Sequence, residues 1–242
     1  MKLAICAGPA TTGKTAVLRH VTRRLRATGR SISYLKIDVQ FAEEDEQFAS
    51  EFGIPTKKVY SGELCPDHCS VMVLGDAMRW AEKNGSEMPL VETAGLCLRC
   101  APYTDGGLGM IVLEATSGMN LPLKVGPMLS LADLCVVTKI DRVSQAEREV
   151  FRARIQDVAP NVKIREVNAL HGIGIDPVIS LLLATPDATE SMLLRGNPPV
   201  GTCTICVGKK EIGWQAHFGV NAQKVTQPND AGAAASSRQV GP

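Results

Sequence analysis

The stretch Gly8-Pro9-Ala10-Thr11-Thr12-Gly13-Lys14-Thr15 follows an apolar run at residues 3–7 and precedes apolar residues at helical spacing, 17, 18, 21 and 25. It matches the G-x-x-x-x-G-K-[ST] phosphate-binding loop. In such loops successive backbone N–H groups face phosphate oxygens, the lysine reaches the β- and γ-phosphates, and the hydroxyl binds Mg²⁺. We therefore expect the loop, together with Ala16, to bind a nucleotide, with Lys14 catalytic and Thr15 a ligand of Mg²⁺.

A second pattern, Thr138-Lys139-Ile140-Asp141, follows an apolar run and matches the [NT]-K-x-D sequence of guanine-nucleotide proteins. The aspartate of that sequence accepts hydrogen bonds from guanine N1 and N2, while the lysine stem packs on the base. Such a hydrogen-bond requirement discriminates strongly between bases. GTP is the expected substrate, with ATP as the alternative because Thr138 stands where asparagine is more usual. A charged loop that caps the following helix is the structural alternative.

Strand-like and helix-like segments alternate along the chain. Strands are expected over 3–7, 31–37, 57–60, 88–92, 110–115, 134–138 and 163–167, and helices over about 71–83, 145–158 and 176–183. This alternation predicts an α/β fold, a mostly parallel sheet with helices on both faces. Ligands bind at the carboxyl ends of such strands, and the residues expected there are Gly8, Asp38, Glu92, Thr138 and Asn168. The acidic run at residues 43–46 is predicted to open a helix in solvent, and His20 to lie at the surface.

The chain divides into three expected parts: a P-loop GTPase domain over 1–185, a C-terminal extension over 186–220 with a Cys-x-x-Cys pair, and a tail over 221–242. The tail contains mainly Gln, Pro, Gly, Ala and Ser, so it buries too little apolar surface to become ordered. The 242 residues suffice for one α/β core with a short appendage.

Composition limits the partners. The formal net charge of +1 gives no general attraction to nucleic acid or membranes. No run of 18 apolar residues and no leader pattern is present, so we expect a cytoplasmic protein without nucleic-acid or membrane partners. In that reducing compartment, eight cysteines indicate metal or redox chemistry more than disulfides.

Five stretches in order carry a family resemblance: GPATTGKT, LKIDVQFAEEDEQFASEFGIP, SGELCPDHC, LVETAGLCLRCAP and EATSGMNLPLKVGPMLSLADLCVVTKID. Over about residues 3–185 this order resembles the nickel-delivery GTPases of hydrogenase and urease maturation, the HypB/UreG group of SIMIBI-class P-loop proteins. The loop Asn168-Ala169-Leu170 resembles the segment that backs the base in these proteins.

The resemblance implies roles for further residues. Asp38, and with it Asp45, would lie beside Mg²⁺ and the attacking water, and Glu92 and Gly95 would belong to the second switch. It also implies slow GTP hydrolysis, with Lys14, Asp38 and Glu92 as the catalytic set. The implied partners are a second copy of the chain, in a nucleotide-dependent homodimer, and a client metalloenzyme or its maturation factor.

Two cysteine groups depart from that family's pattern. Its members carry a Cys-His dipeptide and a single later cysteine, which bind metal across a dimer. Here the two places read C-P-D-H-C and C-L-R-C, so thiolates suit zinc or an iron–sulfur cluster at least as well as nickel. The expected ligands are Cys65, His68, Cys69, Cys97 and Cys100, with Cys203 and Cys206 as further candidates. A structural role for the thiols and a solvent-facing His68 are the alternatives, and Cys6 and Cys135 are expected in the core.

Two functions fit these patterns best. The first is a GTP-hydrolysing maturation protein that couples nucleotide state to the binding or delivery of a nickel-like metal or metallocluster to a client enzyme. The alternative is a nucleotide-driven iron–sulfur reductase or activator with a cluster bridging a dimer. A third is a zinc-stabilised regulatory switch whose cysteines hold the fold. The sequence leaves the metal and the client open.

Overall fold

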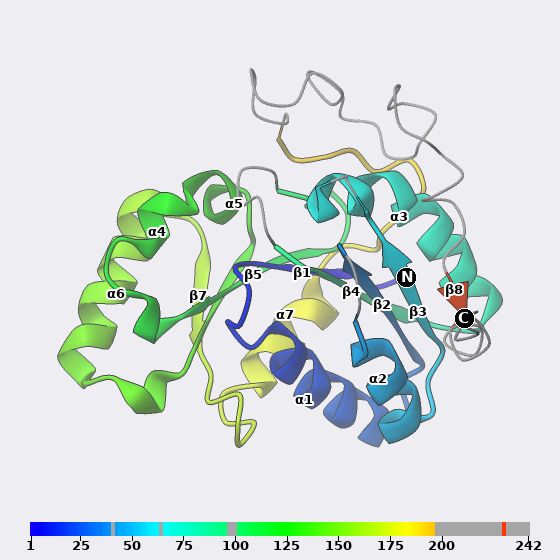
Figure 1. Ribbon diagram of the computed structural model, residues 1–242, viewed down its shortest axis with the longest axis horizontal. Coiled ribbons are helices and arrows are strands. Elements are labelled where there is room, and N and C mark those ends of the chain that lie inside the picture. Colours follow the sequence, from blue (N-terminus) through cyan, green and yellow to red (C-terminus); the bar gives the residue numbers. More distant parts are fainter. Residues whose placement is uncertain (40–41, 63–64, 96–100, 197–228, 231–242) are drawn as a thin grey trace, which may run out of the picture.

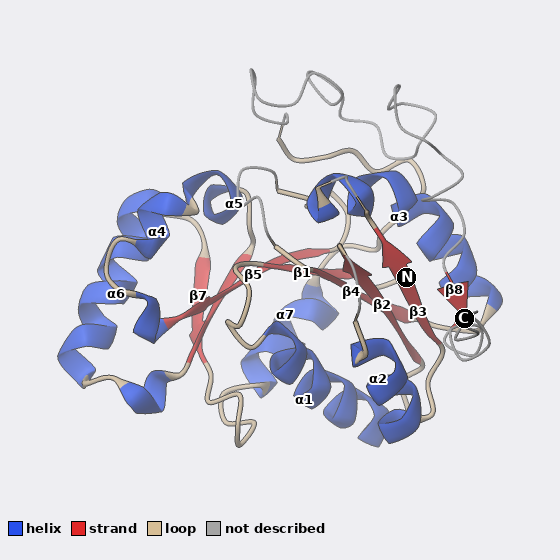
Figure 2. Ribbon diagram, viewed as in Figure 1, coloured by secondary structure: helices blue, strands red, loops and turns tan. Residues whose placement is uncertain are grey.

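A parallel sheet lies at the centre of the protein (Figures 1 and 2). The computed structural model describes residues 1–39, 42–62, 65–95, 101–196 and 229–230. In these residues the strand order is β7-β6-β5-β1-β4-β2-β3-β8. The strands are β1 (Ala4–Ala7), β2 (Ile32–Asp38), β3 (Thr56–Tyr60), β4 (Met88–Thr93), β5 (Leu108–Glu114), β6 (Leu134–Thr138), β7 (Lys163–Glu166) and β8 (Asn229–Asp230). All pairings are parallel except that of β8 with β3.

Helices cover both faces of this sheet, as Figure 1 shows. One face packs against α1 (Lys14–Ala27), α2 (Glu44–Phe52) and α7 (Asp176–Ala184). The other packs against α3 (Pro66–Lys83), α5 (Gly126–Ser130) and α6 (Gln145–Val158), with α4 (Leu121–Lys124) beside α6. Two 3₁₀ turns follow β5 and β6, namely η1 (Ala115–Ser117) and η2 (Ile140–Arg142). The predicted α/β fold is confirmed.

The central strands are buried on both faces, which explains their uninterrupted apolar sequences. Every residue of β1, β4 and β6 is buried. Cys6 and Cys135 are fully covered in these strands, and burial raises the pKa of both thiols. Their prediction as core residues is confirmed.

The main difference from the expected elements is the start of α3. It begins at Pro66, with Cys65 before it, instead of near residue 71. Proline is compatible with the first turn of a helix, because the N–H that it lacks has no partner there in any case. The Cys-x-x-His-Cys group therefore forms the first turn of a helix and not a loop.

Most of the acidic run that opens α2 lies at the surface, as expected, but one of its four residues is buried. Asp45 has no exposed surface, and its carboxylate lies 2.9 Å from the ammonium of Lys58 on β3. The neighbouring Glu44 faces Lys36, at 3.2 Å. Burial in this helix follows from lysines on adjacent strands that the local sequence does not reveal.

The segment after α7 packs back onto the domain. Ala188, Met192 and Leu194 are buried, and the N–H of Arg195 donates to the carbonyl of Tyr103. Most of the expected extension and tail lies outside the described residues, as do Cys97, Cys100, Cys203 and Cys206. In the parts that are described, no helix combines the length and apolar character needed to span a bilayer.

Candidate nucleotide site

The loop between β1 and α1 is closed by its own lysine. The ammonium of Lys14 donates to the carbonyls of Gly8, at 3.0 Å, and Pro9, at 2.8 Å. The hydroxyl of Thr12 also donates to Pro9, at 2.9 Å. Burial lowers the pKa of Lys14, although the nearby Glu92 carboxylate opposes that shift. The ammonium thus lies at the loop's centre, where the sequence pattern predicts phosphate.

Two glycines allow close backbone contacts that no side chain would permit. Gly8 has a φ of +132°, and a Cβ there would lie 2.4 Å from the carbonyl oxygen of Val112. Gly95, just after β4, has a φ of +66°, and its Cβ would lie 1.8 Å from the carbonyl oxygen of Gly8. The expected second switch therefore touches the phosphate loop directly.

Glu92 lies at the centre of a buried polar network. One carboxylate oxygen, Oε1, accepts from the Thr15 hydroxyl and from the Lys36 ammonium, each at 2.8 Å. The other, Oε2, accepts from the Tyr34 hydroxyl at 2.8 Å. The Tyr34 ring stacks on Phe48 of α2, with ring centroids 4.0 Å apart. Burial alone would lower the pKa of Lys36, but the carboxylates of Glu92, Glu44 and Asp38 raise it overall.

A cavity of about 840 Å³ opens over the loop and this network. Its lining residues come from the phosphate loop, α1, β2, the start of α2 with the segment before it, and the end of β4: Ala10, Thr11, Gly13, Lys14, Thr15, Ala16, Arg19, Lys36, Asp38, Ala42, Glu43, Glu44, Gln47, Glu92 and Ala94. Lysine and backbone amides suit phosphate oxygens, and hydroxyl and carboxylate oxygens suit Mg²⁺. Because Thr15 gives its proton to Glu92, its lone pairs remain for a cation. The residues present fit a magnesium nucleotide.

Asp38 and Asp45 were expected to share a place beside that cation, and the structure separates them. Asp38 is partly exposed at the cavity, 3.6 Å from the ammonium of Lys36. Asp45 instead pairs with Lys58 inside the protein. The acidic residue of α2 that reaches the cavity with Asp38 is Glu44, one position earlier.

A second cavity of about 560 Å³ adjoins the first and shares Gly13, Ala16 and Arg19 with it. Its lining includes every residue that the sequence assigned to the base, namely Thr138, Lys139, Asp141, Asn168, Ala169 and Leu170. The phosphate loop, α1 and η2 complete it with Thr12, Gly13, Ala16, Arg19, His20, Arg23 and Arg142. The side-chain oxygen of Asn168 accepts from the N–H groups of Leu170 and His171, at 3.0 and 3.1 Å, and shapes that loop. The structure thus gathers the predicted base residues around one cavity.

Thr138 contacts the phosphate loop. Its hydroxyl donates to the carbonyl of Thr12 at 2.6 Å, and the residue is 1% exposed. Lys139 has a left-handed backbone, with a φ of +55°, and its ammonium pairs with Glu114. Thr138 therefore holds the phosphate loop through its hydroxyl, while Lys139 lines the second cavity.

His20 is partly exposed and also makes a tertiary contact that its expected surface position did not include. Its Nε2 lies 3.0 Å from the carbonyl oxygen of Ala169, and its Nδ1 lies 3.3 Å from an Arg23 nitrogen. Since a carbonyl only accepts and a guanidinium only donates, these partners suit a ring that donates from Nε2 and accepts at Nδ1. His20 connects α1 to the base loop, a tertiary contact that helical spacing does not signal.

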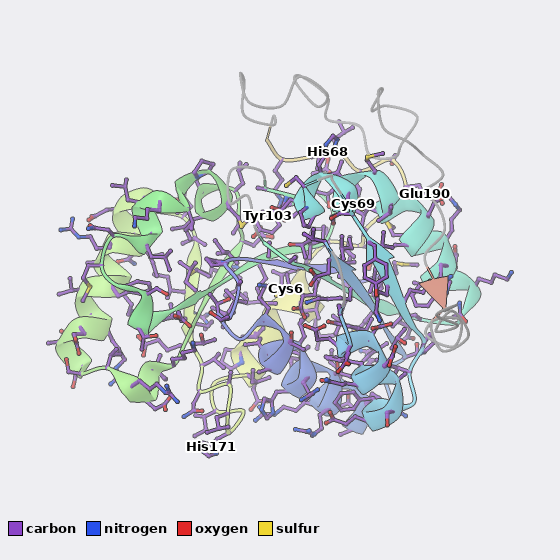
Figure 3. All side chains as sticks on the ribbon, viewed as in Figure 1. Cys6, His68, Cys69, Tyr103, His171 and Glu190 are labelled. Atoms are coloured by element: carbon purple, nitrogen blue, oxygen red, sulfur yellow. The ribbon has the colours of Figure 1, made fainter. Side chains whose placement is uncertain are left out.

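The predicted cysteine site lies only partly in the described residues. Cys65 is partly exposed, whereas His68 and Cys69 are buried. Figure 3 shows His68 and Cys69 at the start of α3. The solvent-facing alternative for His68 is therefore wrong. Burial and the neighbouring Cys65 raise the pKa of Cys69 to about 12, which disfavours the thiolate that binds metal. Within the described ranges, no three His, Cys, Asp or Glu side chains are grouped to hold a metal ion.

Asp67 ties this helix start to the nucleotide site. Its Oδ1 accepts from the Thr93 hydroxyl at 2.9 Å, and Thr93 follows Glu92 at the end of β4. Desolvation raises the pKa of the Asp67 carboxyl to about 6, although the Thr93 hydrogen bond opposes the shift. The cysteine-bearing helix and the end of β4, next to the expected second switch, are thus joined by a buried hydrogen bond.

Comparison with known proteins gives consistent matches. The family described as CobW/HypB/UreG, nucleotide-binding domain, matches residues 2–166. An uncharacterised protein of Methanocaldococcus jannaschii is 43% identical over 222 residues, covering 91% of this chain and 94% of that protein. Urease accessory protein UreG 2 of a Bradyrhizobium species is 27% identical over 188 residues, covering 72% and 86%.

Solved structures show the same fold. Hydrogenase maturation factor HypB from Archaeoglobus fulgidus has a TM-score of 0.60 at 21% identity, covering 75% of this chain and 88% of that one. HypB from Helicobacter pylori, in complex with nickel, has a TM-score of 0.62 at 17% identity, covering 76% and 86%. At these identities the structural likeness concerns the fold alone.

Proposed function

The chain belongs to the CobW/HypB/UreG nucleotide-binding family, and from that premise we propose that it is a GTPase that couples hydrolysis to binding or delivery of a metal to a client enzyme. The observation that carries the proposal is the pair of adjoining cavities, one over the phosphate loop and one beside Asp141. A ligand with a polyphosphate at one end and a base at the other suits this pair. The family and the relative named as a urease accessory protein support nickel as the cargo.

The phosphate end is assigned to residues 8–16. Their backbone N–H groups and Lys14 would hold the β- and γ-phosphates of GTP. Thr15 and Asp38 would hold Mg²⁺, which would neutralise charge on the phosphate oxygens. Glu92 is 1% exposed and its carboxylate oxygens already accept hydrogen bonds, so its role is to position Thr15. Gly95, in contact with the loop, is suited to respond to the γ-phosphate.

The base end is assigned to Asp141, Lys139 and the loop after β7. Asp141 would accept hydrogen bonds from guanine N1 and N2, and the Lys139 stem would pack on the ring. Ala169 and Leu170 would back the base, and Thr138 would act through the loop that it supports. Adenine does not offer these two donors to Asp141, so its binding would leave the carboxylate unpaired. This arrangement therefore favours GTP over ATP.

The metal-cargo site is assigned to the two cysteine groups, the first near the start of α3 and the second just after Gly95. Cys65, His68 and Cys69 on α3 would act with Cys97 and Cys100, and with the same residues of a second copy in a nucleotide-dependent homodimer. Cys203 and Cys206 are further candidates in the extension over 186–220, ahead of the tail over 221–242. The contact of Asp67 with Thr93 supports a link between nucleotide state and ligand position.

Two measurements on the full-length chain, purified without oxygen, test the proposal. Hydrolysis of GTP and ATP with Mg²⁺ is compared for the wild type and for Lys14→Ala. We expect preference for GTP and loss of turnover in the variant, and equal use of both nucleotides would contradict the base assignment. Nickel or zinc without acid-labile sulfide supports a metal-ion cargo. Iron and sulfide near stoichiometry would overturn it in favour of the reductase.

A further inference from the structure

The ammonium of Lys36 lies between three carboxylates. It lies 2.8 Å from Glu92 Oε1, 3.2 Å from Glu44 Oε1 and 3.6 Å from Asp38 Oδ2. These three acids come from β4, α2 and the end of β2, and all line the loop cavity. Convergent carboxylate oxygens are the ligands that hard divalent cations prefer. The side chain of Lys36 is only 4% exposed, so its charge is fixed in place.

We infer that Lys36 is a built-in cation that keeps divalent ions out of the empty nucleotide cavity, so that a metal ion enters only together with a nucleotide. The inference rests on the proposed function in one respect, that the cavity takes a magnesium nucleotide. In a protein that also binds a metal cargo, Lys36 would keep the cargo ion from binding in the nucleotide cavity.

The charge balance at the cavity supports this role. Glu92, Glu44 and Asp38 carry three negative charges, of which Lys36 offsets one, at distances below 4 Å from each acid. The other buried lysine of the cavity, Lys14, donates to the carbonyls of the loop. At an effective dielectric constant of about 20, a pair of unit charges 4 Å apart interacts by about 4 kcal/mol. Removal of the Lys36 charge would therefore markedly increase the attraction of this carboxylate group for a dication.

A nucleotide changes that balance. Its phosphates add negative charge and further oxygen ligands, so a divalent ion gains enough attraction to bind while Lys36 stays on Glu92. Lys36 also holds the carboxylate that accepts the Thr15 proton. The same side chain thus excludes an ion from the empty cavity and keeps Thr15 oriented for the ion that arrives with the nucleotide.

Lys58 provides a matched control. It is the register partner of Lys36 on the adjacent strand β3, and its side chain is also 4% exposed. It pairs with two acids, Asp45 at 2.9 Å and Glu46 at 3.6 Å. Unlike Lys36, it does not line the loop cavity. A charge-removing substitution there disturbs a similar buried ion pair away from the nucleotide.

The test measures Mn²⁺ binding to the full-length, nucleotide-free chain, with free Mn²⁺ followed by electron paramagnetic resonance. Mn²⁺ prefers oxygen ligands, so the cysteines contribute little. We expect Lys36→Gln to bind Mn²⁺ at least about tenfold more tightly than the wild type, and Lys36→Arg and Lys58→Gln to behave like the wild type. Equal affinities for folded Lys36→Gln and wild type would overturn the inference.

A second comparison uses only the wild type, so it tests the inference even if Lys36→Gln does not fold. Mn²⁺ affinity should rise at least about tenfold when a non-hydrolysable GTP analogue is added. Binding of Mn²⁺ that is as tight without the analogue as with it would also overturn the inference. If the proposed function is wrong, the wild type does not bind the nucleotide at all. In that case the comparison of nucleotide-free Lys36→Gln with the wild type still tests the inference about Lys36.

Discussion

The hydroxyl oxygen of Thr15 lies 2.8 Å from Oε1 of Glu92, and this hydrogen bond joins the start of α1 to β4. Glu92 is held in turn by Tyr34 and Lys36, both on β2. The orientation of one hydroxyl is therefore fixed by three strand residues. A carboxylate that is almost fully buried thus sets the direction of a hydroxyl that lines the loop cavity.

Replacement of Thr15 by valine removes the hydroxyl and keeps the shape of the side chain. We expect Mg²⁺ to lose most of its effect on nucleotide affinity, a loss of about 1.5–3 kcal/mol or roughly tenfold to a hundredfold. The measurement is binding of a fluorescent GTP analogue with Mg²⁺ and with EDTA. Thr22→Val is the control, because Thr22 is a fully buried threonine of the same helix outside both cavities. A Thr15→Val chain with wild-type dependence on Mg²⁺ would refute this role.

Gly95→Ala should separate the phosphate loop from the second switch. A Cβ at Gly95 would lie 1.8 Å from the carbonyl oxygen of Gly8, so the backbone must move. Nucleotide affinity is expected to fall by more than about tenfold, with a lower melting temperature as well. Gly85→Ala is the control, since Gly85 has nearly the same φ, +68°, but open space around it. Its cost should be only that of the left-handed backbone, about 1–2 kcal/mol. Equal effects of the two substitutions would rule out the contact as the cause.

Asp141→Asn tests the base assignment. Xanthine carries an oxygen where guanine carries the N2 amino group, and an asparagine amide can donate to that oxygen. The variant should lose affinity for GTP and gain affinity for xanthosine triphosphate, measured by competition for one fluorescent nucleotide. Unchanged affinity for GTP would count against Asp141 as the reader of the base.

Asp67→Asn tests the buried carboxyl between α3 and β4. The folded chain raises the pKa of Asp67 from 3.8 to about 6, so between these values it retains a proton that the unfolded chain releases. The stability of the wild type therefore falls as pH rises through this window, and this group adds no further change above it.

Asparagine still accepts from Thr93 and carries no charge. In metal-free buffer it should stabilise the chain at about pH 8 by up to about 3 kcal/mol, and by less at about pH 4. Denaturant titrations measure this, and an identical pH dependence in both chains would show that Asp67 is not the group concerned.

Sequence alone predicted the fold because its signals are local. The phosphate loop, mostly apolar strands and helical spacing each act over a few residues, and all agree with the sheet observed. The start of α3 was missed because Pro66-Asp67 reads as a turn, although proline is equally suited to a first helical turn. Local patterns do not distinguish these two uses of proline.

The residues that tertiary contacts define were harder to predict. Asp45 lies in an acidic run, and only Lys58 on another strand explains its burial. His20 was assigned to the surface because its partner, Ala169, is distant in the sequence. Lys36 did have a signal, since a lysine between Leu35 and Ile37 in a strand covered on both faces requires a buried anion. The identity of that anion, Glu92, becomes evident only from the register of β2 and β4.

The central claim is that nucleotide state and metal cargo are coupled in this chain. The most direct test is nickel affinity of the full-length protein with Mg²⁺ and either a non-hydrolysable GTP analogue or GDP. We predict affinities that differ by at least about tenfold between the two nucleotides, with the reciprocal difference in nucleotide affinity when nickel is added. Identical nickel affinities in both nucleotide states, in a chain that binds both nucleotides, would contradict the account.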